Sequence, residues 1–174
     1  MVFVPGGGVM RGTVLPVTLL CAGLALALGR SAAWIGMLGV VVLICAAAAV
    51  SLALTSVGMS PGWADGVYLA CWISVAGSAL SVYLPRPVGV VAAVILALDA
   101  GVFCGSISAL TGALQGLWAG LLGLVVLLPV GWTAQRNLLL PLKVVSSWLV
   151  AMAALAAILQ FLPVTPGYLP DHVE

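Results

Sequence analysis

Long apolar runs separated by short polar turns dominate this sequence and limit the folds open to it. Of its 174 residues, 64% are hydrophobic and only 5% are charged. A water-soluble domain carries about 25% charged residues, so this chain could not cover a water-facing surface. Inside a bilayer, a helix of about 20 residues satisfies its own backbone hydrogen bonds. The sequence therefore predicts an all-α, polytopic membrane protein.

Six apolar runs predict a single transmembrane helix bundle over residues 13–164. Residues 1–12, with Pro5 and three consecutive glycines, predict a flexible or surface-lying arm, and residues 165–174 form a polar tail. The first run also resembles a signal peptide, because Arg11, an apolar core and small residues follow in order, but we expect it to be retained. The expected spans are Thr13–Gly29, Ala32–Met59, Gly62–Leu84, Val88–Thr111, Gln115–Ala134 and Leu140–Val164.

The few charges divide between the two sides that six spans would create. The turns after the first, third and fifth spans, with the start of the sixth, carry only basic residues: Arg30, Arg86, Arg136 and Lys143. The opposite side carries one basic and three acidic residues: Arg11, Asp65, Asp171 and Glu174. The positive-inside rule then places the basic turns in the cytoplasm and both termini on the outer, periplasmic side of a bacterial-type inner membrane.

Asp99 is the one charged residue near the middle of an apolar run, the predicted fourth helix. An ionisable group at this depth costs roughly 2.5 to 3.5 kcal/mol, so it indicates a functional site. Ser106 shares its helical face, and Ser74 and Ser78 share one face of the third helix. If these faces meet, Asp99 gains hydroxyl partners. It is then either a group on a solute or cation path or a neutral, hydrogen-bonded structural acid, because desolvation disfavours the charged form.

Small residues in the apolar runs have a simpler interpretation. Gly112, Gly116 and Gly120 repeat at four-residue spacing and predict close helix packing. The chain has four cysteines, all in apolar runs and none in a CxxC pair, and we expect them to pack as small hydrophobic groups, with metal or redox chemistry as the alternative. They are Cys21, Cys45, Cys71 and Cys104.

The residues that most enzymes and cofactor sites require are missing from the sequence. It has no paired carboxylates on one helix, no phosphate-binding glycine loop and no nucleophile elbow. Its single histidine, His172, lies in the polar tail, so a haem or dinuclear metal site would lack ligands. A net charge of +1 gives no basic patch for nucleic acid. We expect no catalysis, no cofactor, no resident metal and no nucleic-acid partner.

From about Leu80 onward the chain resembles the hydrogenase and urease accessory membrane proteins of the HupE/UreJ type. The resemblance rests on SALSVYLPRPVGVVAAVILALDAGVFCGS and on LPLKVVSSWLVAMAALAAIL, with its Ser-Trp pair after a basic residue. It implies a six-helix inner-membrane protein with an outer amino terminus and a role in nickel uptake. Such proteins carry histidines near both ends of the helix that corresponds to Val88–Thr111, where this chain has Phe103-Cys104-Gly105-Ser106. Nickel prefers nitrogen ligands, so the resemblance extends to the fold more than to the metal.

Two functions follow as hypotheses. The first is a small permease-like protein for a solute or cation, nickel included, of the hydrogenase/urease accessory type, with Asp99 on the path. The second is a non-catalytic structural or assembly subunit of a larger membrane complex, favoured by the short loops, the scarce polar lining and six tryptophans. The expected partners are membrane lipid and either other membrane subunits or further copies of the chain.

Overall fold

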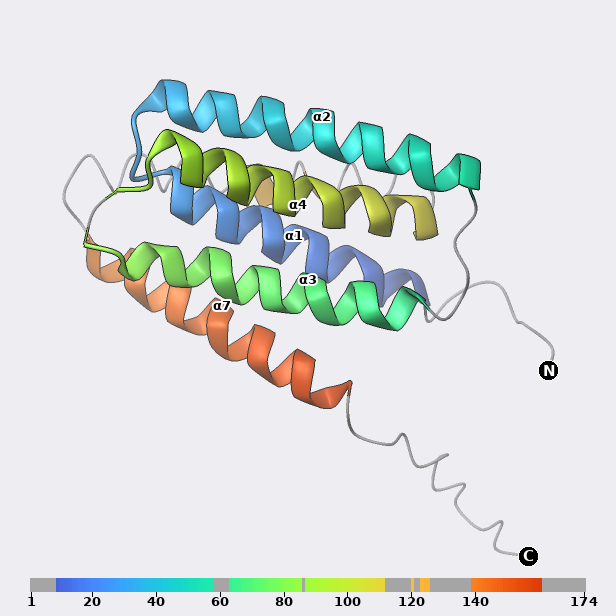
Figure 1. Cartoon of the computed structure of the whole chain (residues 1–174). Helices are drawn as coiled ribbons and strands as arrows, with labels where there is room; N and C mark the ends of the chain where they lie inside the picture. Colours follow the sequence, from blue (N-terminus) through green and yellow to red (C-terminus); the bar gives the residue numbers. More distant parts are fainter. Residues whose placement is uncertain are drawn as a thin grey trace, which may run out of the picture.

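A computed structural model describes residues 9–57, 63–85, 87–111, 120, 123–125 and 139–160. In this part of the chain the secondary structure is helical and contains no strand, as the sequence predicts. The apolar runs form the helices and the polar, Gly- or Pro-containing segments separate them (Figure 1). The long helices are α1 Val9–Leu28, α2 Ala33–Val57, α3 Trp63–Leu80, α4 Val90–Thr111 and α7 Leu139–Leu159, and a 3-10 turn, η1, spans Ser81–Tyr83.

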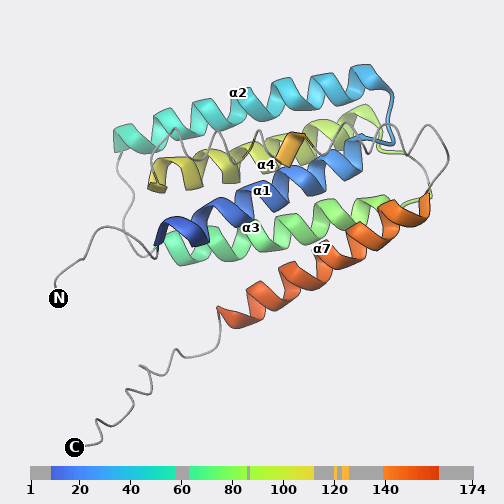
Figure 2. The same cartoon turned by 180° about the vertical axis from the view of Figure 1, so that it is seen from behind.

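The helices run roughly along one common direction and follow the order α2, α4, α1, α3, α7 across the bundle (Figures 1 and 2). The main packing contacts join neighbours in this order, and α3 also contacts α4. α1 begins and α7 ends at the same end of the bundle (Figure 1). Chain order and spatial order therefore differ, because α1 lies between α4 and α3 in this order although α3 and α4 also touch.

α1 forms the centre of the bundle. From Pro16 to Leu28 most of its side chains are buried, as expected of a helix that is hydrophobic all round. Val17, Leu20 and Leu24 have no exposed surface, and Leu28 is 1% exposed. The helix begins at Val9, inside the segment expected to be an arm, and contains Pro16.

α2 packs against α4 through small residues that the sequence analysis did not single out. A Cβ atom added at Gly101 would lie 2.6 Å from the Ala46 Cβ, and one added at Gly105 would lie 2.6 Å from the Ala47 carbonyl oxygen. Real Cβ atoms do not approach so closely, so the two backbones meet only because these positions are glycine. Gly101 and Gly105 of α4 therefore have the same four-residue spacing as Gly112 and Gly116, and they pack closely against α2.

Four of the described helical segments are long and apolar enough to cross a membrane: Ala33–Val57, Gly66–Tyr83, Val90–Leu110 and Leu140–Leu159. Leu15–Leu28 of α1 is a shorter apolar segment. Large apolar side chains cover the outside of the bundle, including Met37 and Leu52, each 72% exposed. These helices suit a membrane protein, since lipid would contact that surface. The predicted fifth span, Gln115–Ala134, lies almost wholly outside the described residues.

Candidate functional site

Asp99 meets a hydroxyl group at the seam between α3 and α4. It lies near the middle of α4 and is partly buried. The Ser74 hydroxyl, from the middle of α3, donates a hydrogen bond to the Asp99 Oδ2 atom. A buried carboxyl group without a partner would be costly, and this bond offsets part of that cost. The structure thus brings Asp99 into contact with Ser74, one of the serines that the sequence predicts as its partners.

The other two serines of the predicted polar site direct their hydroxyl groups elsewhere. Ser78 donates to the Ser74 carbonyl oxygen at 2.8 Å, and Ser106 donates to the Val102 carbonyl oxygen at 2.8 Å. Both bonds stay within one helix and span four residues, a common arrangement for serine in an apolar helix. Both side chains are buried. Ser74 is therefore the serine of the predicted set that donates to Asp99.

A recess opens along the same seam, one helical turn from the Asp99–Ser74 pair. It holds about 400 Å³ and is lined by Trp63, Gly66, Val67, Ala70 and Phe103. Phe103 is four residues after Asp99 on α4, and Ala70 is four residues before Ser74 on α3. The recess lies toward the end of the bundle where α3 begins, and neither Asp99 nor Ser74 is among its lining residues.

The pair of oxygen-bearing side chains sets the chemistry that this seam could support. Carboxylate and hydroxyl oxygens suit a proton or a hard cation, whereas nickel favours imidazole nitrogen. Within the described residues, no three His, Cys, Asp or Glu side chains lie close enough together to hold a metal ion. Among the described residues, the seam therefore offers one carboxyl group and one hydroxyl group as oxygen ligands.

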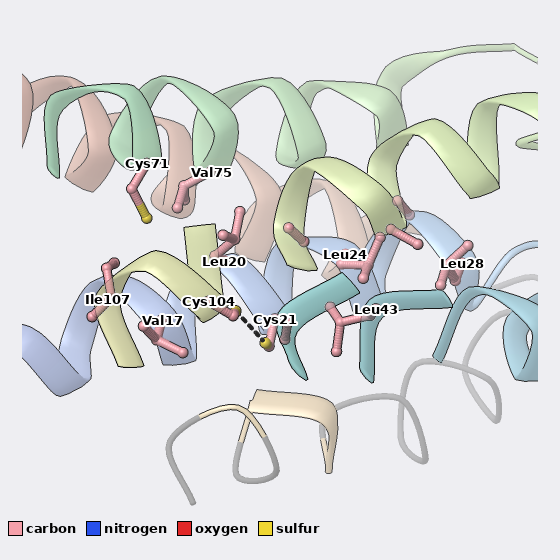
Figure 3. Close-up of a cluster of buried hydrophobic side chains, with 14 of the residues drawn as sticks. Val17, Leu20, Cys21, Leu24, Leu28, Leu43, Cys71, Val75, Cys104 and Ile107 are labelled. Carbon is pink, nitrogen blue, oxygen red and sulfur yellow. Dashed lines mark hydrogen bonds between the residues drawn. The ribbon is translucent and has the colours of Figure 1, made fainter. Parts of the chain in front are cut away.

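Three cysteines lie in the bundle core beside this seam (Figure 3). The sulfur atoms of Cys21 on α1 and Cys104 on α4 are 3.7 Å apart, a thiol–thiol contact. Cys71 on α3 belongs to the same apolar cluster, and all three are buried. Cys45 is exposed on α2, and the four thiols are free. The three buried cysteines pack as small apolar groups among leucine and valine.

Two of the four basic residues expected at the cytoplasmic side come together at the other end of the bundle. Arg30 follows α1 and Lys143 lies in the first turns of α7, and both line one recess there. Arg86 and Arg136 lie outside the described residues. Arg30 and Lys143 therefore lie at one end of the bundle, and the placement of the basic residues on the cytoplasmic side stays a prediction.

The glycine spacing of the predicted fifth helix can be examined at only one of its three positions. A Cβ atom added at Gly120 would lie 3.7 Å from the Cys21 sulfur atom, an ordinary contact, and Gly112 and Gly116 lie outside the described residues. Gly123, which the sequence analysis missed, is more tightly packed. A Cβ atom there would lie 2.5 Å from the Thr18 carbonyl oxygen of α1. Among the described glycines, Gly101, Gly105 and Gly123 make closer helix contacts than Gly120.

Comparison with known protein families, characterised proteins and solved structures found no match for the chain. The resemblance to the hydrogenase and urease accessory proteins therefore stays a prediction. Among the described side chains, the Asp99–Ser74 pair bears most directly on function.

Proposed function

We propose that this protein is a small permease-like protein of a bacterial-type inner membrane, which passes a proton, a hard cation or a small polar solute along the seam between α3 and α4. The observation that carries the proposal is the hydrogen bond from Ser74 to Asp99 beside an open recess on the same seam. An acidic group in an apolar helix is costly and needs either a function or a structural partner. Here it has one hydroxyl partner and an adjoining opening.

The choice of cargo follows from the ligand atoms. Asp99 and Ser74 present oxygen atoms, which suit protons and hard cations. Nickel, which the family resemblance would imply, has no imidazole ligand in the apolar runs, because the single histidine is His172 in the tail. Nickel is therefore the least favoured of the cations that the proposal covers.

The proposed orientation has six spans, with both termini on the outer side. It is supported by two observations at opposite ends of the bundle. α1 begins and α7 ends at one end (Figure 1), whereas Arg30 and Lys143 lie together at the other. The positive-inside rule assigns the basic end to the cytoplasm. The recess next to Phe103 would then open toward the outside.

A second proposal is a non-catalytic subunit that packs against other membrane proteins or against copies of itself. Its support is the position of α7 at the edge of the bundle, where α3 is its principal neighbour. Most of the remaining surface of α7 is apolar apart from Lys143 and Ser147, and Val144 and Trp148 are 65% and 55% exposed. Lipid can cover such a surface, but so can another helix.

Flux into liposomes tests the first proposal. The purified protein would be reconstituted with a pH-sensitive dye inside, and proton, sodium and nickel uptake would be measured separately. We expect Asp99→Asn to abolish uptake of at least one cation, because Asn keeps the shape but cannot carry the charge. The control is Ser147→Ala, an exposed serine on α7, which should transport like the wild type.

The second proposal has its own readout. Native mass spectrometry of the protein extracted in mild detergent from its own membrane would show which subunits leave with it. Stoichiometric foreign subunits together with unchanged flux for Asp99→Asn would favour the structural role. A lone chain whose flux depends on Asp99 would reject it.

A further inference from the structure

A recess at the end of the bundle opposite the Phe103 recess collects two basic side chains from distant parts of the chain. It holds about 280 Å³ and lies where α1 ends, η1 turns and α7 begins. No acidic residue is among the described residues that line it. These residues are Arg30, Val82, Tyr83, Leu84, Pro85 and Lys143. We propose that this recess binds the phosphate group of an anionic membrane lipid.

Arg30 is already held in place for this role. Its Nη1 atom donates hydrogen bonds to the carbonyl oxygen of Val82 at 2.5 Å and to that of Leu84 at 3.1 Å. A guanidinium group has five N–H donors in a fixed plane, so bonds through one nitrogen leave the donors of the other two for a ligand. A positioned guanidinium loses less conformational entropy when it binds phosphate. Arg30 can therefore both tie η1 to α1 and bind an anion.

Lys143 supplies a second cation to the recess. The Tyr83 hydroxyl donates to the Lys143 carbonyl oxygen at 2.9 Å, which fixes the start of α7 beside η1. Within the described part of the chain, the Lys143 ammonium group itself makes no hydrogen bond or ion pair. Its side chain is exposed and long enough to reach toward the end of the bundle. A phosphate in the recess would give this charge a partner.

The position of the recess favours a lipid over a soluble phosphate. Two of the membrane-length segments have their ends here, Gly66–Tyr83 and Leu140–Leu159, so the recess lies at the edge of the apolar zone. Lipid phosphates lie just outside the hydrocarbon core, and basic pockets between membrane helices on the cytoplasmic side bind anionic headgroups. Val82, Leu84 and Pro85 add an apolar wall that glycerol and acyl groups could contact. Soluble phosphate would gain nothing from that wall.

Lipid titration followed by native mass spectrometry tests the proposal on the full-length protein. Phosphatidylglycerol and phosphatidylcholine with the same acyl chains would be added to wild type, Lys143→Gln, Arg30→Gln and Arg11→Gln. Arg11 is the matched control because it lies on α1 near the opposite end of the bundle. Each basic side chain near the membrane surface corresponds to about fivefold in affinity for an anionic lipid. We expect Lys143→Gln and Arg30→Gln to weaken the first phosphatidylglycerol adduct by about fivefold each.

Arg30→Gln also removes two bonds to the backbone and could unfold η1, so Lys143→Gln is the deciding variant. Equal affinity for the two lipids, or an equal loss with Arg11→Gln, would overturn the proposal. A third arm adds inorganic phosphate at millimolar concentration. If inorganic phosphate binds wild type but not Lys143→Gln while phosphatidylglycerol binds both equally, the recess takes soluble phosphate instead and the lipid assignment is wrong. The binding readout does not depend on flux, so this test stands apart from the permease proposal.

Discussion

Ser74 on α3 donates its hydroxyl hydrogen to the Asp99 carboxyl group on α4. This bond links the two helices at mid-depth of the bundle and gives the Asp99 carboxyl group a partner within the described part of the chain. The neighbouring Ser78 does not donate to Asp99, because its hydroxyl donates to a carbonyl group of its own helix. The pair is therefore both the basis of the proposed solute path and a structural tie.

The strength of this tie can be measured by a double-mutant cycle. Hydrogen bonds between membrane helices contribute about 0.6 kcal/mol on average and at most about 1.7 kcal/mol. We expect Ser74→Ala to lower the free energy of unfolding in mixed detergent by an amount in that range. In the Asp99→Ala background the same change should cost almost nothing. Equal losses in both backgrounds would show that the hydroxyl stabilises α3 without contacting Asp99.

The α2–α4 contact predicts a strong effect of added methyl groups. Gly101→Ala and Gly105→Ala would place a Cβ atom within 2.6 Å of the Ala46 Cβ and of the Ala47 carbonyl oxygen, respectively. Overpacking of this kind costs typically 1 to 3 kcal/mol, and we expect a loss of that size for each variant. The controls are Gly36→Ala on α2 and Gly77→Ala on α3, where an added Cβ meets nothing within 4 Å. These should be neutral or slightly stabilising, because Ala favours helix.

A buried serine holds the edge helix to the bundle. The Ser146 side chain is fully buried and its hydroxyl donates to the Ala79 carbonyl oxygen of α3. We expect Ser146→Ala to destabilise the protein by about 0.6 to 1.7 kcal/mol, measured by thermal unfolding in detergent. The adjacent Ser147 is exposed, so Ser147→Ala is the matched control and should leave the unfolding temperature unchanged. A larger effect at Ser147 would place α7 in a different rotation.

The contact between Cys21 and Cys104 can be tested by oxidation. Their sulfur atoms are 3.7 Å apart, so a small rotation of either side chain would let them bond. Iodine should oxidise the two thiols to a disulfide, with release of two iodide ions and two protons. Intact mass and thiol counting should then show two remaining thiols in wild type. The control is the single variant Cys21→Ser, which starts with three thiols and should keep all three.

Oxidation of Cys45 or Cys71 in the Cys21→Ser variant would contradict the packing. Cys45 is exposed on α2, away from the core cluster. A disulfide between two protein molecules would appear as a dimer on a non-reducing gel. Dilution of the sample should reduce the dimer but leave the intramolecular disulfide unchanged.

Much of the fold follows from the sequence because a bilayer leaves the backbone few choices. Apolar runs of membrane length must be helices there, and the polar turn at Arg30-Ser31 and the break around Pro85 separate them as predicted. The contact between Asp99 and Ser74 could also be anticipated, because Asp99 shares a helix face with Ser106 and Ser74 shares one with Ser78. The end of α3 was less predictable. It changes to a 3-10 turn at Ser81, where Arg30 binds the carbonyl groups of Val82 and Leu84.

The glycine spacing that marks the packed face of α4 is present in the sequence, but it did not enter the prediction of helix packing. Gly101 and Gly105 repeat at the same four-residue spacing as Gly112 and Gly116, and spacing alone does not say which repeat faces another helix. The structure decides this, because Ala46 and Ala47 of α2 lie directly against the two α4 glycines.

The sequence by itself determined that the protein is helical and apolar, where most of its described helices lie, and that Asp99 needs a partner. Tertiary structure alone decided which helices are neighbours, which serine donates to Asp99, and that Arg30 and Lys143 share one recess. The physical reason is that these helices are apolar on all sides. In lipid no contrast between a polar surface and an apolar core orients them, so close packing and a few hydrogen bonds choose the arrangement.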